Sequence, residues 1–302
     1  MKMYAMLFGA VLALSPAVSA SAAETELGPT LQKIRDSKVI AIGHRTSSIP
    51  FSYFDDKENV IGYSQDLCQK IIDTVKSKVG IPDLATRMIP VTSQNRMSLV
   101  QNGTVDLECG VTSNLKDRWQ QVAFLNSFFT STPKILTRKD SGIKDFPDLA
   151  GKTVVTNAGT NPERMLRTMN DAKSMKMNIQ SVKDYGEGLL ILQSGRAVAY
   201  VMDDILMAGT RLQAQNPSDW VLVGSTISDP EPWGFMVRKD DPQFKALADD
   251  ALSALMRSPE IKQIYARWFL SPVPPKAANF DFPMSDEVAK LYAAPNDRPA
   301  AP

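Results

Sequence analysis

Arginines, small polar side chains and one carboxylate stand directly after several predicted strands of this 302-residue sequence. These residues are Arg45, Ser93, Arg96, Ser113, Arg118, Asn157, Thr160 and Asp203. A guanidinium group presents a planar fork that holds a carboxylate or phosphate through two hydrogen bonds. Hydroxyl groups and helix N-termini add further donors for an anion, and Asp203 suits an ammonium group. Together the set predicts a small ligand with anionic ends and one amine.

Charge matching narrows this prediction to a dicarboxylic amino acid, which carries two negative charges and one positive charge. Two arginine-bearing clusters and one aspartate leave none of these charges unpaired, and an unpaired buried charge is costly. Taken singly, each residue also has an ordinary structural interpretation. Arginines beside turns usually form surface ion pairs, and Ser93 and Asp203 could each cap a helix. Only their shared position after strands favours a binding site.

Strands and helices alternate along the chain, and this pattern predicts an α/β fold with mostly parallel sheets. Ligands bind such sheets at the carboxyl ends of the strands. Strands are expected at 39–43, 87–91, 105–111, 135–137, 153–155, 197–202, 221–223 and 233–238. Helices are expected to begin at Ser64, Ser93, Asn161–Pro162, Asp184 and Asp241–Pro242. The helix that begins at Ser64 should end at Gly80. A proline-rich remainder follows Ser271, with a short helix capped by Ser285, and residues 293–302 are expected to form a mobile tail.

The composition argues against several classes of protein. The 34 basic and 33 acidic residues give a formal charge of +1, so no bulk positive charge exists to hold nucleic acid or an anionic membrane. One histidine, His44, and two cysteines are too few for a His/Cys zinc site, and no cofactor is predicted. A serine hydrolase triad would have to use His44.

The N-terminus has the pattern of a secretory signal peptide over residues 1–22. Lys2 is followed by an apolar run at 4–14 and by small residues, with cleavage expected after Ala20 or Ala22. The alternative is a buried N-terminal helix. No later stretch is apolar for the ~18 residues of a membrane span, so we expect a soluble, exported and hence periplasmic protein.

Export affects how the two cysteines are interpreted. Cys68 lies in a predicted helix and Cys109 in a predicted buried strand. A helix packed on its sheet can bring two such positions within disulfide range, and an oxidising compartment allows the bond. We therefore favour a Cys68–Cys109 disulfide over two separate buried thiols.

Several segments together resemble the periplasmic glutamate/aspartate-binding proteins of polar amino-acid ABC transporters. The resemblance covers essentially the whole mature chain. It is carried by Gly43–Arg45, Pro50–Tyr53, Gly62–Asp66, Thr92–Arg96, Gln101–Thr104, Glu108–Gly110, Ser194–Ala199, Met202–Asp204 and Arg238–Phe244.

The resemblance implies a two-lobe, type II periplasmic binding protein fold with two hinge strands and a ligand cleft between the lobes. Lobe 1 would comprise residues 23–132 and 237–302, including the proline-rich extension, and lobe 2 residues 133–236. The implied mechanism is capture of glutamate or aspartate by hinge closure, followed by delivery to the membrane permease of an ABC importer. We expect a monomer.

The resemblance also implies a role for each site residue. Arg118, helped by Ser113 and Thr160, would bind the ligand α-carboxylate. The Val111 carbonyl, Ser113 and Asp203 would bind the α-ammonium, and Arg45, Ser93 and Arg96 the side-chain carboxylate.

Three positions depart from the family pattern and leave the choice between glutamate and aspartate open. Val111 replaces an expected serine, Tyr185 an expected histidine near the side-chain carboxylate, and Asn157 an expected threonine. One alternative is a related dicarboxylate or another polar amino acid. A second is a periplasmic enzyme, such as a dehydratase, using His44, Tyr185 or Glu187 as acid or base. A third is the sensing module of a receptor.

Overall fold

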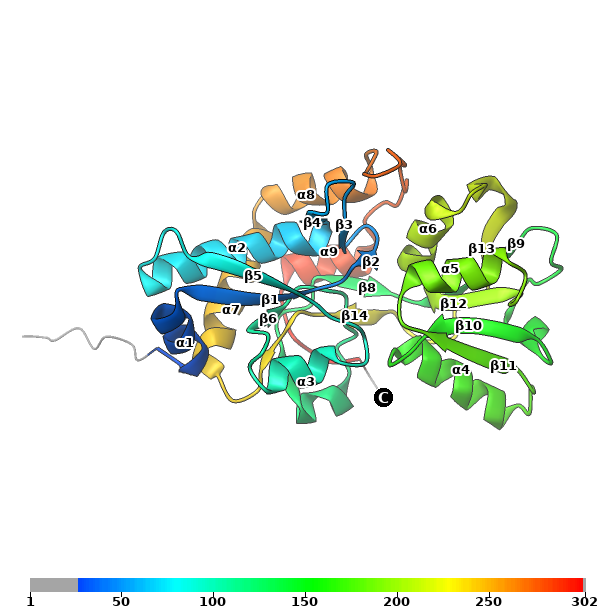
Figure 1. Ribbon diagram of the computed structural model, residues 1–302, viewed down its shortest axis with the longest axis horizontal. Helices are drawn as coiled ribbons and strands as arrows, with labels where there is room; N and C mark the ends of the chain where they lie inside the picture. Colours follow the sequence, from blue (N-terminus) through cyan, green and yellow to red (C-terminus); the bar gives the residue numbers. More distant parts are fainter. Residues whose placement is uncertain (1–26, 301–302) are drawn as a thin grey trace, which may run out of the picture.

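The computed structural model describes residues 27–300, which fold into two lobes that lie side by side (Figure 1). The sheet of the first lobe has the strand order β5-β1-β6-β15-β7. Its strands are β5 (Ala85–Pro90), β1 (Val39–His44), β6 (Leu107–Glu108), β15 (Met236–Arg238) and β7 (Val122–Phe124). In this sheet β15 runs in the opposite direction to the other four strands.

The sheet of the second lobe has the strand order β11-β10-β12-β9-β13. Its strands are β11 (Asn178–Val182), β10 (Thr153–Asn157), β12 (Ala199–Asp203), β9 (Pro133–Arg138) and β13 (Trp220–Val223). Here β9 runs against both of its neighbours. Both sheets are therefore mostly parallel, as predicted, and both direct several strand ends toward the junction of the lobes.

Two antiparallel strands, β8 (Phe129–Ser131) and β14 (Glu231–Trp233), connect the lobes. They are the hinge strands of a type II binding-protein fold. The sequence pattern predicts a single strand at 233–238, but the chain instead forms β14 and β15. Gly234 lies between these two strands, close to the Leu125 carbonyl. A small third sheet in the first lobe contains β2 (Ser47–Ser48), β3 (Ser52–Phe54) and β4 (Val60–Ile61).

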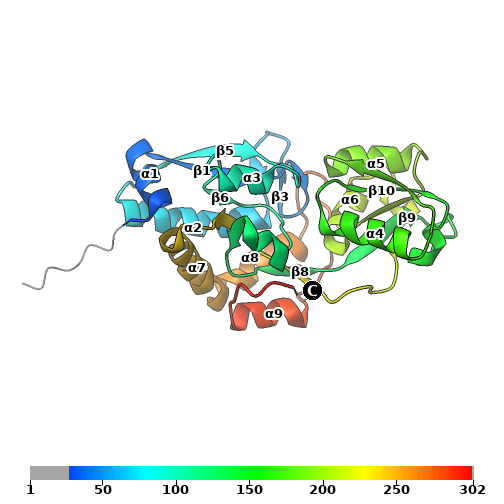
Figure 2. The ribbon, with the colours of Figure 1, turned by 90° about the horizontal axis from the view of Figure 1, so that it is seen from below.

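Helices cover the faces of both sheets (Figures 1 and 2). The first lobe contains α1 (Pro29–Ser37), α2 (Tyr63–Val79), α3 (Arg96–Gln101), the 3-10 helix η1 (Lys116–Gln120), α7 (Pro242–Arg257), α8 (Glu260–Phe269) and α9 (Asp286–Ala293). The second contains η2 (Phe146–Leu149), α4 (Asn161–Ala172), α5 (Tyr185–Gln193), α6 (Asp204–Gln213) and η3 (Pro217–Asp219). Helix α8 was not predicted.

Local capping explains several helix ends. Asp184, Asp241 and Ser285 accept hydrogen bonds from the backbone at the starts of α5, α7 and α9, as predicted, and Gly80 ends α2 in the left-handed conformation. Two predicted caps in the first lobe are wrong. Ser64 lies inside α2, where its hydroxyl donates to the Gly110 carbonyl at 2.9 Å, and Asn95, not Ser93, precedes α3.

Aromatic rings fill the core of the first lobe beside the hinge. Phe51 makes edge-on contacts with Tyr63, Phe129, Trp233 and Phe269 at centroid distances of 4.9–5.9 Å. Phe129 and Trp233 belong to the two hinge strands. The hinge is therefore anchored in an apolar core on the side of the first lobe, because burial of such rings dominates core energetics.

The predicted disulfide is confirmed, since Cys68 of α2 is bonded to Cys109, which follows β6. The predicted mobile tail is wrong for the described residues 294–300. Asn296, Asp297 and Ala300 form hydrogen bonds with the first lobe, and their partners lie far away in the sequence. The predicted signal peptide lies outside the described residues. Within residues 27–300, no helix has both the length and the apolar character to cross a membrane.

Candidate functional site

The end of β1 places Arg45 at the junction of the lobes. Its Nη1 atom donates to the Ser93 hydroxyl at 2.8 Å, and its backbone N–H donates to Ser52 Oγ at 2.9 Å. Only 3% of Arg45 is exposed. Ser93 is thus a partner of the guanidinium group, which explains why it is not a helix cap.

Arg96 is the first residue of α3 and is also only 3% exposed. Its Nη1 donates to the Val111 carbonyl at 2.6 Å, while its Nε has no hydrogen-bond partner among the described residues. Burial lowers the pKa of Arg96 to about 9, and the charge of Glu108 opposes that shift. A second anion beside Arg96 would stabilise its charged form further.

Arg118 lies in η1, and its Nη1 donates to the Ser113 carbonyl at 2.9 Å. Burial lowers the pKa of this guanidinium group, and nearby carboxylates, Asp117 first among them, oppose the change. Ser113 in turn forms an isolated antiparallel bridge with Trp233 of hinge strand β14. The segment 111–118 therefore connects two arginines with the hinge.

The second lobe contributes polar groups from the end of β10 and the start of α4. Asn157 accepts a hydrogen bond from the Tyr200 hydroxyl through Oδ1, while its buried Nδ2 has no partner in the described chain. Thr160 caps α4, since its Oγ1 accepts from Glu163 N at 3.2 Å and donates to the Asn157 carbonyl at 2.7 Å. Asn161, the predicted cap, is instead the first helical residue.

Asp203 ends β12 and is 4% exposed. It precedes α6 without a side-chain capping bond, so the capping interpretation is not supported. Its Oδ1 has no partner within residues 27–300. Burial raises the pKa of Asp203 well above its usual value, and the negative charge of Glu231 adds to this effect. A nearby ammonium group would favour the ionised form.

Tyr185, the first residue of α5, is buried and stacks on Tyr200. Burial raises its pKa to about 12, although the charge of Arg45 opposes the rise. The phenol therefore keeps its proton at neutral pH and can act as a hydrogen-bond donor without carrying charge.

Two buried carboxylates were missed by the charge matching of the sequence. Glu108 ends β6, and its Oε2 accepts from Thr112 Oγ1 at 3.0 Å. Glu231 begins β14 and accepts from Asn161 Nδ2. Burial raises the pKa of both. The three arginines thus face three carboxylates rather than Asp203 alone. The one sequence signal for these additional carboxylates was Glu108, an acidic residue inside a strand that was predicted to be buried.

The candidate acids and bases of an enzyme have structural partners. His44 is buried, its Nδ1 lies 3.1 Å from the Arg45 carbonyl, and its ring packs edge-on against Phe54. Burial lowers the pKa of His44. Glu187 is exposed and accepts from Lys183 N at 3.1 Å. Within residues 27–300, no group of three His, Cys, Asp or Glu side chains could hold a metal ion.

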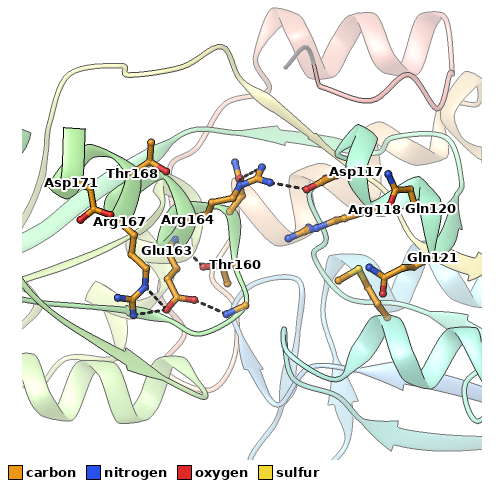
Figure 3. Close-up of a pocket in the computed structure, with 13 residues that line it drawn as sticks. Asp117, Arg118, Gln120, Gln121, Thr160, Glu163, Arg164, Arg167, Thr168 and Asp171 are labelled. Carbon is orange, nitrogen blue, oxygen red and sulfur yellow. Dashed lines mark hydrogen bonds and ion pairs between the residues drawn. The ribbon is translucent and has the colours of Figure 1, made fainter. Parts of the chain in front are cut away.

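A cleft of about 610 Å³ opens between η1 and α4 (Figure 3). Arg118 and Thr160 line it, whereas the remaining predicted site residues do not. Across this cleft Arg164 Nη1 contacts Asp117 Oδ2 at 2.7 Å and so joins the lobes. The lobes also meet where Tyr185 N donates to Ser47 Oγ at 3.4 Å. Arg45, Arg96 and Asp203 are thus enclosed between the lobes, away from the open cleft.

Comparisons with known proteins agree with this architecture. Residues 40–271 match the family described as bacterial extracellular solute-binding proteins, family 3. The chain is 48% identical to the "glutamate/aspartate import solute-binding protein" of Salmonella typhimurium, over 90% of this chain and 89% of that protein. It is also 48% identical to the "L-glutamate/L-aspartate-binding protein" of Pseudomonas aeruginosa, over 94% of both chains.

A solved structure of an ancestral arginine-binding protein bound to arginine is similar in fold. It has a TM-score of 0.69 at 24% identity and covers 77% of this chain and 98% of its own. At this identity the likeness concerns the fold alone.

Proposed function

The chain belongs to the bacterial extracellular solute-binding proteins, family 3, and we propose that it captures glutamate or aspartate for an ABC importer. The lobes close over the ligand, and the closed form delivers it to a membrane permease. Hinge closure of this kind is established for periplasmic binding proteins. Relatives with 46–48% identity are named as transport binding proteins, and this chain acts as a binding protein rather than an enzyme.

One observation supports an acidic amino acid as the ligand. Arg45, Arg96 and Asp203 are almost fully enclosed between the lobes, and Arg96 Nε, Asn157 Nδ2 and Asp203 Oδ1 have no partner among the described residues. Two of these atoms are donors and one is an acceptor. An α-amino acid with a second carboxylate supplies acceptors for the donors and an ammonium group for the aspartate. Buried polar groups ordinarily have partners, so a ligand of this chemistry fits.

Each residue then has a role. Arg118, Ser113 and Thr160 bind the α-carboxylate, while Asp203, Ser113 and the Val111 carbonyl bind the α-ammonium. Arg45, Ser93 and Arg96 hold the side-chain carboxylate, with Tyr185 and Asn157 as neutral donors from the second lobe. The ligand favours the closed state because only that state offers contacts from both lobes.

Calorimetry on protein stripped of carried-over ligand tests the proposal. Glutamate and aspartate should bind tightly, and glutamine and histidine should not. Arg45→Ala should weaken binding by about 2–5 kcal/mol, because the substitution removes one partner of a desolvated charge pair.

Arg138→Ala is the matched control, because Arg138 is exposed and pairs with Asp140 at 2.9 Å. That variant should bind like the unaltered protein. A loss below ~1 kcal/mol for Arg45→Ala would show that this buried arginine does not pair with the ligand, and it would contradict the proposed site. Tight binding of a neutral amino acid would contradict the ligand class.

We also propose that the protein is a periplasmic monomer without affinity for nucleic acid, with lobe 1 formed by residues 23–132 and 237–302 and lobe 2 by 133–236. The family is extracellular by its description, and the near-zero formal charge of +1 supports the nucleic-acid statement.

A further inference from the structure

The C-terminal segment, residues 272–300, lies beyond the stretch that matches the family, 40–271, yet it contacts the hinge. Helix α9 buries Val288 and Tyr292 against the first lobe. The Tyr292 hydroxyl donates to the Phe128 carbonyl at 3.1 Å, immediately before hinge strand β8. Figure 2 shows the segment after α9 running toward the junction of the lobes.

After α9 the chain hydrogen-bonds to the first lobe at three backbone positions. The Asn296 carbonyl accepts from Ser127 N at 2.8 Å, and the Asp297 carbonyl accepts from Asn114 Nδ2 at 2.8 Å. Ala300 N then donates to the Asn114 carbonyl at 2.8 Å, and Ala300 pairs with Leu115 in a parallel bridge. We call residues 296–300 the C-terminal strap.

Two of these three backbone positions, Asp297 and Ala300, bond to Asn114, which is fully buried. Its Oδ1 accepts from Trp119 Nε1 of η1 at 2.6 Å, and its backbone N–H donates to the Pro232 carbonyl of hinge strand β14 at 2.8 Å. Both side-chain polar atoms and both backbone polar groups of Asn114 are therefore engaged. They join η1, a hinge strand and the strap.

The segment that Asn114 fixes carries two of the proposed ligand contacts. Ser113 precedes it, and Arg118 lies four residues further on and donates to the Ser113 carbonyl. We propose that Asn114 is a positioning residue, and that the C-terminal strap holds Ser113 and Arg118 in the geometry that binds the ligand α-carboxylate. Bidentate recognition of a carboxylate depends on such fixed geometry. This inference rests on the proposed function.

Two variants remove strap contacts, one of them all and the other a single one, without altering a proposed ligand contact. One is a chain that ends at Ala294, which keeps α9. The other is full-length Ala300→Pro, which removes only the N–H that donates to Asn114. The shortened chain should bind glutamate about tenfold more weakly, the equivalent of one or two hydrogen bonds. The proline variant should show a smaller loss in the same direction. Without ligand, thermal unfolding of both variants should shift by only a few degrees.

Asn279→Ala is the control within the same C-terminal segment, because the Asn279 side chain donates to the Leu270 carbonyl, away from the site. It should leave the glutamate dissociation constant unchanged. If the shortened chain bound glutamate more weakly because of a general loss of stability, that loss of affinity would not depend on Arg118. The loss of affinity is therefore also measured in an Arg118→Lys background. There, ending the chain at Ala294 should cost much less than tenfold, because the two changes share one mechanism.

Unchanged affinity in both strap variants would overturn the inference, as would an equal loss in the Arg118→Lys background. If the unaltered protein bound neither glutamate nor aspartate, the proposed function would fail as well. Normal binding by the unaltered protein together with unaffected variants would contradict the strap alone.

Discussion

The ligand-binding role proposed for Asp203 has a cost for the stability of the unliganded protein. Asp203 is buried, one of its oxygens has no partner in the described chain, and its pKa is raised chiefly by burial. In the unfolded chain the same carboxyl group titrates at its ordinary value. The folded protein therefore holds the Asp203 proton more tightly, and folding stability falls as the pH rises from the unfolded pKa through the folded pKa.

Asp203→Asn should therefore stabilise the unliganded protein at pH values above the ordinary pKa of the carboxyl group. We expect a gain of roughly 1–3 kcal/mol at pH 8, because the neutral amide avoids the cost of a buried charge. The same variant should lose several kcal/mol of glutamate affinity, since the ammonium group loses its counter-charge. Urea unfolding without ligand and calorimetry with glutamate measure the two effects.

Asp140→Asn provides the comparison, because Asp140 is exposed and its pKa is lowered by its hydrogen bond with Arg138. Asp140→Asn should leave glutamate binding unchanged. It should not show the gain in stability that is expected for Asp203→Asn. A less stable Asp203→Asn protein with unchanged affinity would show that this carboxylate has a structural rather than a binding role.

At the scale of elements, α2 and the segment after β6 are joined both covalently and by hydrogen bonds. The Cys68–Cys109 disulfide closes a loop of 41 residues. In addition, Gln65 Nε2 donates to the Cys109 carbonyl at 2.7 Å, and Ser64 Oγ to the Gly110 carbonyl. These bonds support the backbone that leads to Val111 and Ser113.

Replacing both cysteines with alanine should lower the free energy of unfolding by about 3–5 kcal/mol, the range expected for a loop of this length. Glutamate affinity should change little, because the hydrogen bonds from Ser64 and Gln65 remain. Denaturant unfolding and calorimetry test the two statements separately. An unchanged unfolding midpoint would contradict the first, and a large loss of affinity would assign the disulfide a direct role in shaping the site.

At the scale of the whole molecule, the lobes touch at points that leave no room for larger side chains. A Cβ atom added to Gly209 of α6 would lie 2.4 Å from the Ile49 carbonyl oxygen of the first lobe. A Cβ atom added to Gly159 would lie 3.0–3.1 Å from three atoms of Gln94. Both glycines permit the close approach of the lobes that encloses Arg45 and Asp203.

Gly209→Val should act as a wedge between the lobes. We expect binding of glutamate to weaken at least tenfold, since the ligand loses contacts available only in the closed state. Small-angle X-ray scattering with saturating glutamate should give a larger radius of gyration than for the unaltered protein. Ala172→Val, at an exposed position of α4, should change neither quantity, and full closure of Gly209→Val would contradict the steric role of the glycine.

The elements and several site positions could be predicted from the sequence because their signals are local. Hydrophobic spacing, caps such as Asp184 and Asp241, and the Gly80 stop each depend on a few neighbouring residues. Parallel sheets then direct ligand groups to strand ends, and this rule identified Arg45 and Asp203 as candidates. The family resemblance supplied the roles proposed for them.

Only the tertiary structure decided which polar groups are enclosed together. Glu108 and Glu231 altered the charge balance because burial and partners come from residues distant in the chain. Residues 293–302 were predicted to form a mobile tail, yet Asp297 bonds to Asn114, 183 residues away. Local composition cannot encode such a contact, since its free energy exists only after the first lobe has folded and brought both backbones together.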